Sequence, residues 1–300
     1  MTAQDYQKSE STLVLPSSGG KIVLGDNLEV LRSLPDESFD LIYVDPPFNT
    51  GHSRSLTSLA TTADERGDRT GFAGRRYRTT QLGTMSYGDQ FDDYMGFLGP
   101  RIVEMRRLLK ATGSLYLHLD PRESHYAKVF CDEIFGRDCF LNEIIWAYDY
   151  GARTNKRWPA KHDDILLYVK DARHYWFDNE SVDRIPYMAP GLVGAEKAAA
   201  GKLPTDVWWH TIVPTAGKER TGYPTQKPIG ILRRVVAASC PTGGLVGDFF
   251  AGTGTTGAAA SEKGCRFLMV DNNPEAVDVM ERRFTELGVE IEINRFRTEA

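Results

Sequence analysis

The chain has 300 residues, of which 41% are hydrophobic and 26% are charged, and this composition suits one large globular domain, with or without a small insertion. No apolar run reaches the roughly 18 residues that a membrane helix needs, and the N-terminal MTAQDYQKSE lacks the apolar core of a secretory signal. The net charge of −5 argues only weakly against nucleic acid as a partner, because grooves bind phosphates through local basic patches.

The first predicted elements end in polar and proline-rich turns. We expect residues 1–20 to be a flexible N-terminus, followed by a strand at Ile22–Leu24 and a helix over 27–34. Leu41–Val44 is a continuous apolar run, typical of a strand buried on both faces. It must end at Asp45 because two prolines follow.

The middle of the chain alternates between strands and helices after a long irregular stretch. Residues 50–90 are rich in Ser, Thr, Gly and Arg, and we expect a long mobile loop there. A helix is expected over 92–109, interrupted near Gly99-Pro100. The elements expected next are a strand at 114–120, a helix over 123–135, and strands at 143–147 and 165–170.

Residues 172–222 break this rhythm and are expected to form a small insertion. After it come a helix over 228–239, a strand–turn–helix–strand unit, a helix over 274–286 and a last short strand. The alternation predicts an α/β fold with a mostly parallel sheet. In this division, 21–171 and 223–300 are two halves of one catalytic domain.

A glycine-rich turn lies between the strand and the helix of the later unit. Gly252 and Gly254 let a ligand approach the backbone, and the helix that follows offers unpaired N–H groups. Asp271 ends the next strand, where a carboxylate can bind both hydroxyls of a ribose. With Gly257, the turn also matches the dinucleotide pattern. A nicotinamide enzyme, however, normally opens with this unit, and Asp248 beside the turn suits the amine of a methionine moiety better than a pyrophosphate.

The tetrapeptide Asp45-Pro46-Pro47-Phe48 follows the buried strand. Methylation of the amine of adenine or cytosine needs two acceptors that aim the nitrogen lone pair, since conjugation with the ring makes the amine a poor nucleophile. Asp45 can supply one acceptor, and the carbonyl of Pro46 can supply the other on a rigid proline edge. Phe48 offers a face for stacking an extruded base. Positioning and electrostatics suffice for this chemistry, so no metal is expected.

Together these motifs resemble the amino-DNA methyltransferases, the N6-adenine and N4-cytosine enzymes of bacterial restriction and epigenetic systems. The catalytic tetrapeptide precedes the S-adenosylmethionine (AdoMet) motif, an order that resembles the β class. TGYPTQKP before the AdoMet strand, LLKATGSLYLHLD, and the stretch from NEIIWAYDYG to HDDILLYVK are also similar to that class. The resemblance implies a Rossmann-like mixed sheet of seven strands in permuted order, with 172–222 as the target-recognition insertion.

The resemblance also implies roles for individual residues. Asp45, Pro46, Pro47 and Phe48 would be catalytic, and Asp at the first position favours N6-adenine over N4-cytosine. The cofactor-binding residues would be Asp26, Asn27, Lys227, Asp248, Phe250, Gly252, Gly254, Thr255, Asp271 and Asn272.

Two locally basic segments could contact double-stranded DNA or could be ordinary solvated faces. The candidates for DNA binding are Arg75, Arg76, Arg78, Lys156, Arg157, Lys161 and His162. The resemblance further implies a bacterial cytoplasmic, nucleoid-associated enzyme, with a second copy of itself and a cognate restriction endonuclease as candidate partners. The cysteines lack CxxC spacing and are expected to be reduced thiols.

Three other classes stay open on the sequence alone. One is an RNA or protein-glutamine methyltransferase, although these usually place the AdoMet motif before the catalytic one. The others are a nicotinamide oxidoreductase and a non-catalytic DNA-binding module, and the intact tetrapeptide and turn argue against the last.

Overall fold

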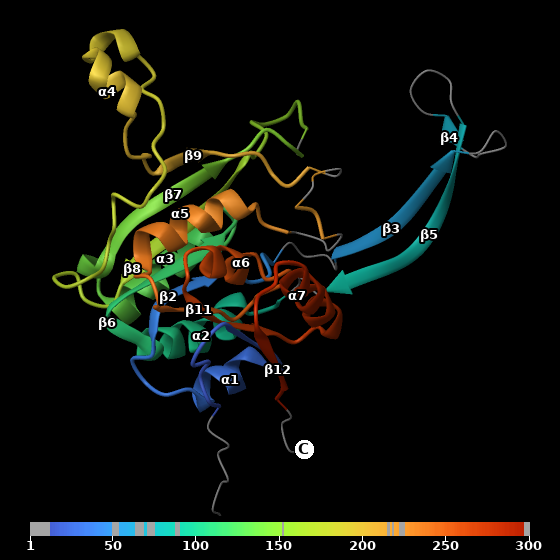
Figure 1. The fold of residues 1–300 in the computed structure, drawn as a ribbon, viewed down its shortest axis with the longest axis horizontal. Coiled ribbons are helices and arrows are strands. Elements are labelled where there is room, and N and C mark those ends of the chain that lie inside the picture. The colour runs from blue at the N-terminus through green and yellow to red at the C-terminus, as the bar shows by residue number, and fades with distance from the viewer. Residues whose placement is uncertain are drawn as a thin grey trace, which may run out of the picture.

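The computed structural model describes residues 13–49, 54–63, 69–70, 76–87, 91–151, 153–214, 217, 219–221 and 226–296, and only the backbone within 54–87. Figure 1 shows a central sheet between two layers of helices, with a long narrow β-ribbon extending away from it. Within the described ranges, no helix has the length and apolarity required to cross a bilayer.

The central sheet has nine strands, with five neighbouring pairs parallel at one side and an antiparallel strand, β8, near the other. In spatial order the strands are β12 (Ile291–Arg295), β1 (Gly20–Leu24), β11 (Arg266–Asp271), β10 (Leu245–Asp248), β2 (Phe39–Val44), β6 (Leu109–Leu119), β8 (His162–Val169), β7 (Phe140–Ala147) and β9 (Val207–Trp209). The expected α/β class with a mixed sheet is confirmed, but the expected count of seven strands is wrong. The strand that the sequence did not predict is β9, which is only three residues long and shows no buried pattern. β12, which is largely open to solvent, is the expected last short strand.

Helices cover both faces of the sheet because the central strands are apolar on both sides. On one face lie α1 (Asn27–Ser33), α2 (Tyr94–Leu108) and α3 (Ser124–Phe135), and on the other lie α5 (Ile229–Ser239), α6 (Thr255–Glu262) and α7 (Pro274–Glu286). In β2, Ile42 and Val44 pack with the first group, and Leu41 and Tyr43 with the second. This division explains why the whole β2 sequence is buried.

The expected interruption of α2 is wrong, since the helix continues through Pro100. Proline removes the hydrogen bond to the carbonyl of Gly96, but Pro100 lies on the exposed face. The opposite face buries Leu98, Ile102 and Met105 in the core, and this burial offsets the lost hydrogen bond.

Two segments expected to be irregular are ordered where the structure describes them. Within 50–90, β3 (Arg54–Ala63) pairs antiparallel with β5 (Arg76–Tyr87), which also pairs with β4 (Arg69–Thr70). The expected loop is therefore a β-ribbon in these ranges, and many threonines there favour strand structure. Of the expected flexible N-terminus, 1–12 lie outside the described residues, whereas Leu13 is buried in the core.

The region 172–222 contains the short helix α4 (Ala195–Ala200) and contributes β9 to the sheet. β9 runs parallel to β7, and Trp208 is buried while its neighbour Trp209 is exposed. The part of the chain that the structure describes also contains 3-10 turns at Arg137–Cys139 and Pro190–Leu192. All four cysteines are free thiols, because none forms a disulfide.

Candidate active site

The two sequence motifs meet at one edge of the sheet. β2 and β10 are neighbouring parallel strands, in which Leu41 lies beside Val246, so both strands end at the same edge. Asp45, Asp248 and Gly252 line one cavity of about 40 Å³ there. The chain order also changes direction between these two strands, which is where open α/β sheets bind ligands.

Asp45 makes an ion pair that the sequence did not reveal. Its Oδ2 lies 2.9 Å from Nζ of Lys227, and both side chains are largely buried. Its other oxygen, Oδ1, is buried without a hydrogen-bond partner. Lys227 Nζ also lies 4.5 Å from the centre of the Phe48 ring, as a cation over an aromatic face. Between Asp45 and Phe48 in the chain, Pro46 is buried and Pro47 is partly buried.

A buried polar network supports Phe48 and was missed by the sequence analysis. His118 of β6 is fully buried, with Nδ1 2.6 Å from the Tyr43 hydroxyl and Nε2 3.2 Å from Asp163 Oδ2. The Tyr148 hydroxyl donates to the other Asp163 oxygen at 3.0 Å. The His118 ring lies 5.8 Å from the Phe48 ring, centre to centre. A histidine and an aspartate inside apolar strands were the available signal, since buried polar groups need partners.

The pKa values of Tyr43 and Asp163 in this network shift in opposite directions. Burial raises the pKa of the Tyr43 hydroxyl well above its usual value, and the charges of Asp45, Asp248 and Asp163 add to this. Burial alone would also raise the pKa of Asp163, but its hydrogen bond to His118 and the charge of Lys227 lower it overall. Lys227 therefore acts on two carboxylates of the site.

The backbone of the glycine turn adopts angles that favour glycine. Gly252 and Gly254 have φ angles of +51° and +69°, in the left-handed region that favours glycine. A Cβ at Gly254 would lie 2.9 Å from Met280 Cγ, so no side chain fits there. Thr255 begins α6 and receives a hydrogen bond from Arg283 at 2.9 Å.

The structure gives Asp248 a role in holding the turn. Its two oxygens accept hydrogen bonds from the Phe250 N–H at 3.0 Å and the Thr256 hydroxyl at 2.6 Å. Burial, opposed by these hydrogen bonds and reinforced by the charges of Asp45 and Asp271, raises the pKa of Asp248 to about 7. The carboxyl group lines the cavity, although both oxygens already have partners.

Asp271 connects the end of β11 to the turn. Its Oδ2 accepts from the Gly252 N–H at 2.8 Å and its Oδ1 accepts from the Asn273 N–H at 2.9 Å. Burial raises its pKa. Each carboxylate oxygen can accept a second hydrogen bond, so ribose hydroxyls remain compatible with this geometry. Asn272, beside it, is exposed.

Asp26, Asn27 and Phe250 lie together against the turn. Asp26 caps α1 by accepting from the N–H groups of Leu28 and Glu29. The Asn27 amide donates to the carbonyl of Phe249 at 2.8 Å. Phe250 packs edge-on against Phe97 in the core. Each of these residues has a structural partner, which is compatible with a binding role but does not demand one.

The described basic candidates lie in and beside the segment between β7 and β8. Lys156 and Arg157 are exposed, as is the neighbouring Trp158, which is 94% exposed. Lys161 lies 3.6 Å from Asp149, and His162 begins β8 at 3.7 Å from Asp164. Arg76 and Arg78 are on β5, whose side chains are not described, and Arg75 lies outside the described residues.

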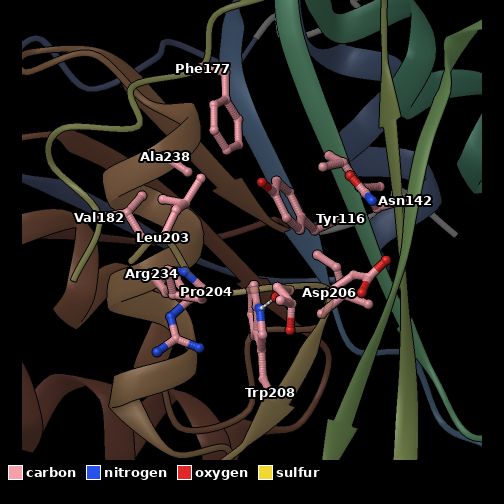
Figure 2. A pocket seen from close by; sticks show the side chains of 13 residues that line it. Tyr116, Asn142, Phe177, Val182, Leu203, Pro204, Asp206, Trp208, Arg234 and Ala238 are labelled. Atoms are coloured by element: carbon pink, nitrogen blue, oxygen red, sulfur yellow. Dashed lines mark hydrogen bonds between the residues drawn. The ribbon is translucent and has the colours of Figure 1, made fainter. Parts of the chain in front are cut away.

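A larger cavity of about 360 Å³ lies elsewhere on the α5 face of the sheet. Figure 2 shows its aromatic lining, in which Tyr116, Phe177 and Trp208 surround an apolar space between β6, α5 and the 172–222 region. None of the candidate catalytic, cofactor-binding or DNA-binding residues lines this cavity, and Arg234, which does line it, is paired with Asp183. The small cavity at the motif edge is therefore the candidate active site.

The residues at that edge fit AdoMet by their chemistry. The positive-φ glycines leave backbone without side chains for a nucleoside, and Asp271 adds a carboxylate beside them. The unpaired Asp45 oxygen is an acceptor that a substrate donor can satisfy. Among the described residues, no three His, Cys, Asp or Glu side chains cluster as metal ligands would.

Comparison with protein families finds a family model that matches most of the chain. The model of a DNA methylase family that covers N6 and N4 enzymes matches residues 39–282. DNA adenine methyltransferase YhdJ of Escherichia coli (strain K12) is 28% identical over 275 residues, which cover 87% of this chain and 81% of that protein. Type II methyltransferase M.ScaI of Streptomyces caespitosus is 28% identical over 268 residues, covering 85% and 78%.

Solved structures share the fold. The M1.HpyAVI–SAM complex aligns with a TM-score of 0.56 at 16% identity, covering 88% of this chain and 98% of that one. PvuII DNA methyltransferase (cytosine-N4-specific) aligns with a TM-score of 0.60 at 15% identity, covering 92% and 95%. At these identities the similarity establishes the fold alone.

Proposed function

The chain belongs to the DNA methylase family, and from this premise we propose that it transfers a methyl group from AdoMet to N6 of a flipped adenine in double-stranded DNA. The observation that carries the proposal is that Asp45 of the tetrapeptide and Gly252 of the turn line the same cavity. A base held at Asp45 then faces a cofactor held at the turn. The two motifs come from opposite halves of the chain and meet because β2 and β10 end at the same edge of the sheet.

Asp45 and the residues after it do the positioning. AdoMet, when bound, supplies an electrophilic methyl group. The Asp45 carboxylate, one of whose oxygens is buried and unpaired, accepts one amine hydrogen, and the Pro46 carbonyl accepts the other, which directs the nitrogen lone pair toward the methyl carbon. Phe48 stacks on the base, with His118 fixing the tilt of its ring. The proton that the methylated nitrogen must lose passes to the Asp45 carboxylate.

Two observations support adenine over cytosine. YhdJ, a relative over most of the chain, is named a DNA adenine methyltransferase. Asp45 also occupies the position where the resemblance associates aspartate with adenine. Cytosine N4 presents the same amine chemistry, and the fold neighbour PvuII is named cytosine-N4-specific, so N4-cytosine is the second candidate.

Long-read sequencing of host DNA with and without this gene tests the proposal. We expect N6-methyladenine at one recurrent sequence that disappears when the gene is deleted. N4-methylcytosine in its place would select the second candidate. DNA with no gene-dependent modification, although the purified protein binds AdoMet, would refute the proposed function.

We propose that DNA contacts come from Lys156, Arg157, Lys161 and His162, which lie in or next to the segment between β7 and β8. Tyr148 at the start of this segment and Asp163 of β8 belong to the network behind Phe48. A phosphate backbone held by these cations would therefore lie near the base site. The proposal includes Arg75, Arg76 and Arg78 on the basis of the sequence alone.

We propose a bacterial cytoplasmic, nucleoid-associated enzyme, with a second copy and a cognate endonuclease as further partners. Relatives such as M.ScaI are named type II methyltransferases, and this naming supports a restriction context. Light scattering on the purified protein tests self-association, and loss of host viability on deleting the gene tests for an active endonuclease.

A further inference from the structure

Lys227 lies where the proposed reaction needs the target amine to lie. The sequence resemblance placed this lysine near the cofactor. We propose that in the free enzyme the Lys227 ammonium stands in for the target amine and is displaced when the base enters, so that Lys227 is a positioning residue of the base site. The inference rests on the proposed function.

The first observation is the hydrogen-bond donor at Asp45. Lys227 Nζ lies 2.9 Å from Asp45 Oδ2, and the two side chains are 11% and 18% exposed. An ammonium and an exocyclic amine are both N–H donors, and both suit a carboxylate acceptor. The other oxygen of Asp45 has no partner, so the lysine satisfies only half of the acceptor.

The second observation is the position of the same ammonium over Phe48. Nζ lies 4.5 Å from the ring centre, above the face on which a base would stack. A base stacked on Phe48 and a lysine over Phe48 exclude each other. Lys227 therefore fills both features of the base site, the acceptor and the stacking face.

The third observation is the size of the cavity. Lys227 and Gln226 line the space between Asp45 and the glycine turn, and that space is about 40 Å³. Sites that hold small molecules typically measure roughly 300–1,000 Å³. The free cavity is far smaller than such a site, and among the lining residues Lys227 is the one that holds Asp45.

The charges around Lys227 explain why it rests there in the free enzyme. Asp45, Asp163 and Asp248 all act on the Tyr43 hydroxyl between them, and the charge of Lys227 acts on Asp163. A cation among buried carboxylates lowers their mutual repulsion. A neutral amine that displaces Lys227 restores the donor at Asp45 but not the cation. The exchange therefore adds little to the affinity for DNA.

This exchange predicts how much the target amine contributes to DNA affinity. In the wild type the amine only replaces Lys227, so its contribution is small. In Lys227→Met the carboxylate has no donor until the base arrives, and a hydrogen bond to a charged group then adds on the order of ten- to a hundredfold in affinity. The factor by which the amine raises DNA affinity should therefore be at least about ten times larger in the variant than in the wild type.

The test uses duplexes that carry the recognition sequence found by long-read sequencing, with adenine or purine at the target. Purine lacks the 6-amine, and its weaker pairing affects every variant equally, so only a change in the ratio of the two Kd values counts. Fluorescence anisotropy without cofactor gives these ratios. Lys110→Met is the matched control, because Lys110 of β6 pairs with Asp40 of β2 at 2.7 Å, outside the active-site cavity.

A purine-to-adenine Kd ratio about tenfold higher in Lys227→Met than in both wild type and Lys110→Met is the expected result. Equal Kd ratios in all three proteins would overturn the inference. If AdoMet binding were also weaker in Lys227→Met, the lysine would be assigned to the cofactor instead. If Lys227→Met fails to melt cooperatively, Lys227→Ala is judged by the same ratio. Host DNA without any modified base would remove the proposed function itself, and this inference with it.

Discussion

Replacing Asp45 with alanine tests the chemistry on which the proposed function depends. The substitution removes a buried acceptor that has no partner, Asp45 Oδ1, together with the oxygen that holds Lys227. Removing one preorganised polar group that acts in a transition state typically costs about 3–4 kcal/mol, which is roughly 10²–10³ in kcat. We therefore expect Asp45→Ala to lose methylation by about that factor, and Asp45→Asn, which keeps one carbonyl acceptor, to lose less.

AdoMet binding should survive the same substitution. The turn is held by hydrogen bonds of Asp248 and Asp271, and none of these involves Asp45. We expect the AdoMet Kd of Asp45→Ala to stay within about threefold of wild type, a difference below roughly 1 kcal/mol. Isothermal titration gives this Kd, and single-turnover transfer of tritiated methyl groups to DNA gives the rate. Asp45→Ala with more than a tenth of wild-type activity would refute the assigned role.

Three further changes test the turn and the DNA contacts. Asp248 has a raised pKa of about 7 against an ordinary value of 3.8, so between these pH values the folded protein holds a proton that the unfolded chain has released. Stability should fall by up to about 4 kcal/mol as pH rises through this window, and Asp248→Asn should flatten the slope in urea titrations; parallel slopes would contradict this. Gly254→Ala should destabilise by about 2–4 kcal/mol, because Gly254 has positive φ and a Cβ would crowd Met280, and a urea-derived loss below 1 kcal/mol would count against this reasoning. The double variant Lys156→Ala/Arg157→Ala should lower the slope of log affinity against log salt by about 2, and an unchanged slope would exclude both residues as phosphate contacts.

The sequence by itself determined the local elements and the two motifs. Leu41–Val44 had to be a buried strand because every residue is apolar, and Pro46 and Pro47 had to end it. The glycines of the turn predicted a close approach of a ligand to the backbone, and the structure adds their φ values of +51° and +69°, which favour glycine. Parallel strands have their carboxyl ends at one edge, so the meeting of the motifs followed once the sheet was recognised.

Only the tertiary structure decided which side chains meet. Periodicity reports burial along one segment, but it does not identify the partner that a buried polar group finds in another segment. For this reason the sequence showed neither the pairing of Lys227 with Asp45 nor the bonds from His118 to Tyr43 and Asp163. The sequence did not predict the edge strand β9 for a related reason. Its three residues at the rim of the sheet are stabilised by the neighbouring strand β7 and show no periodic pattern of their own.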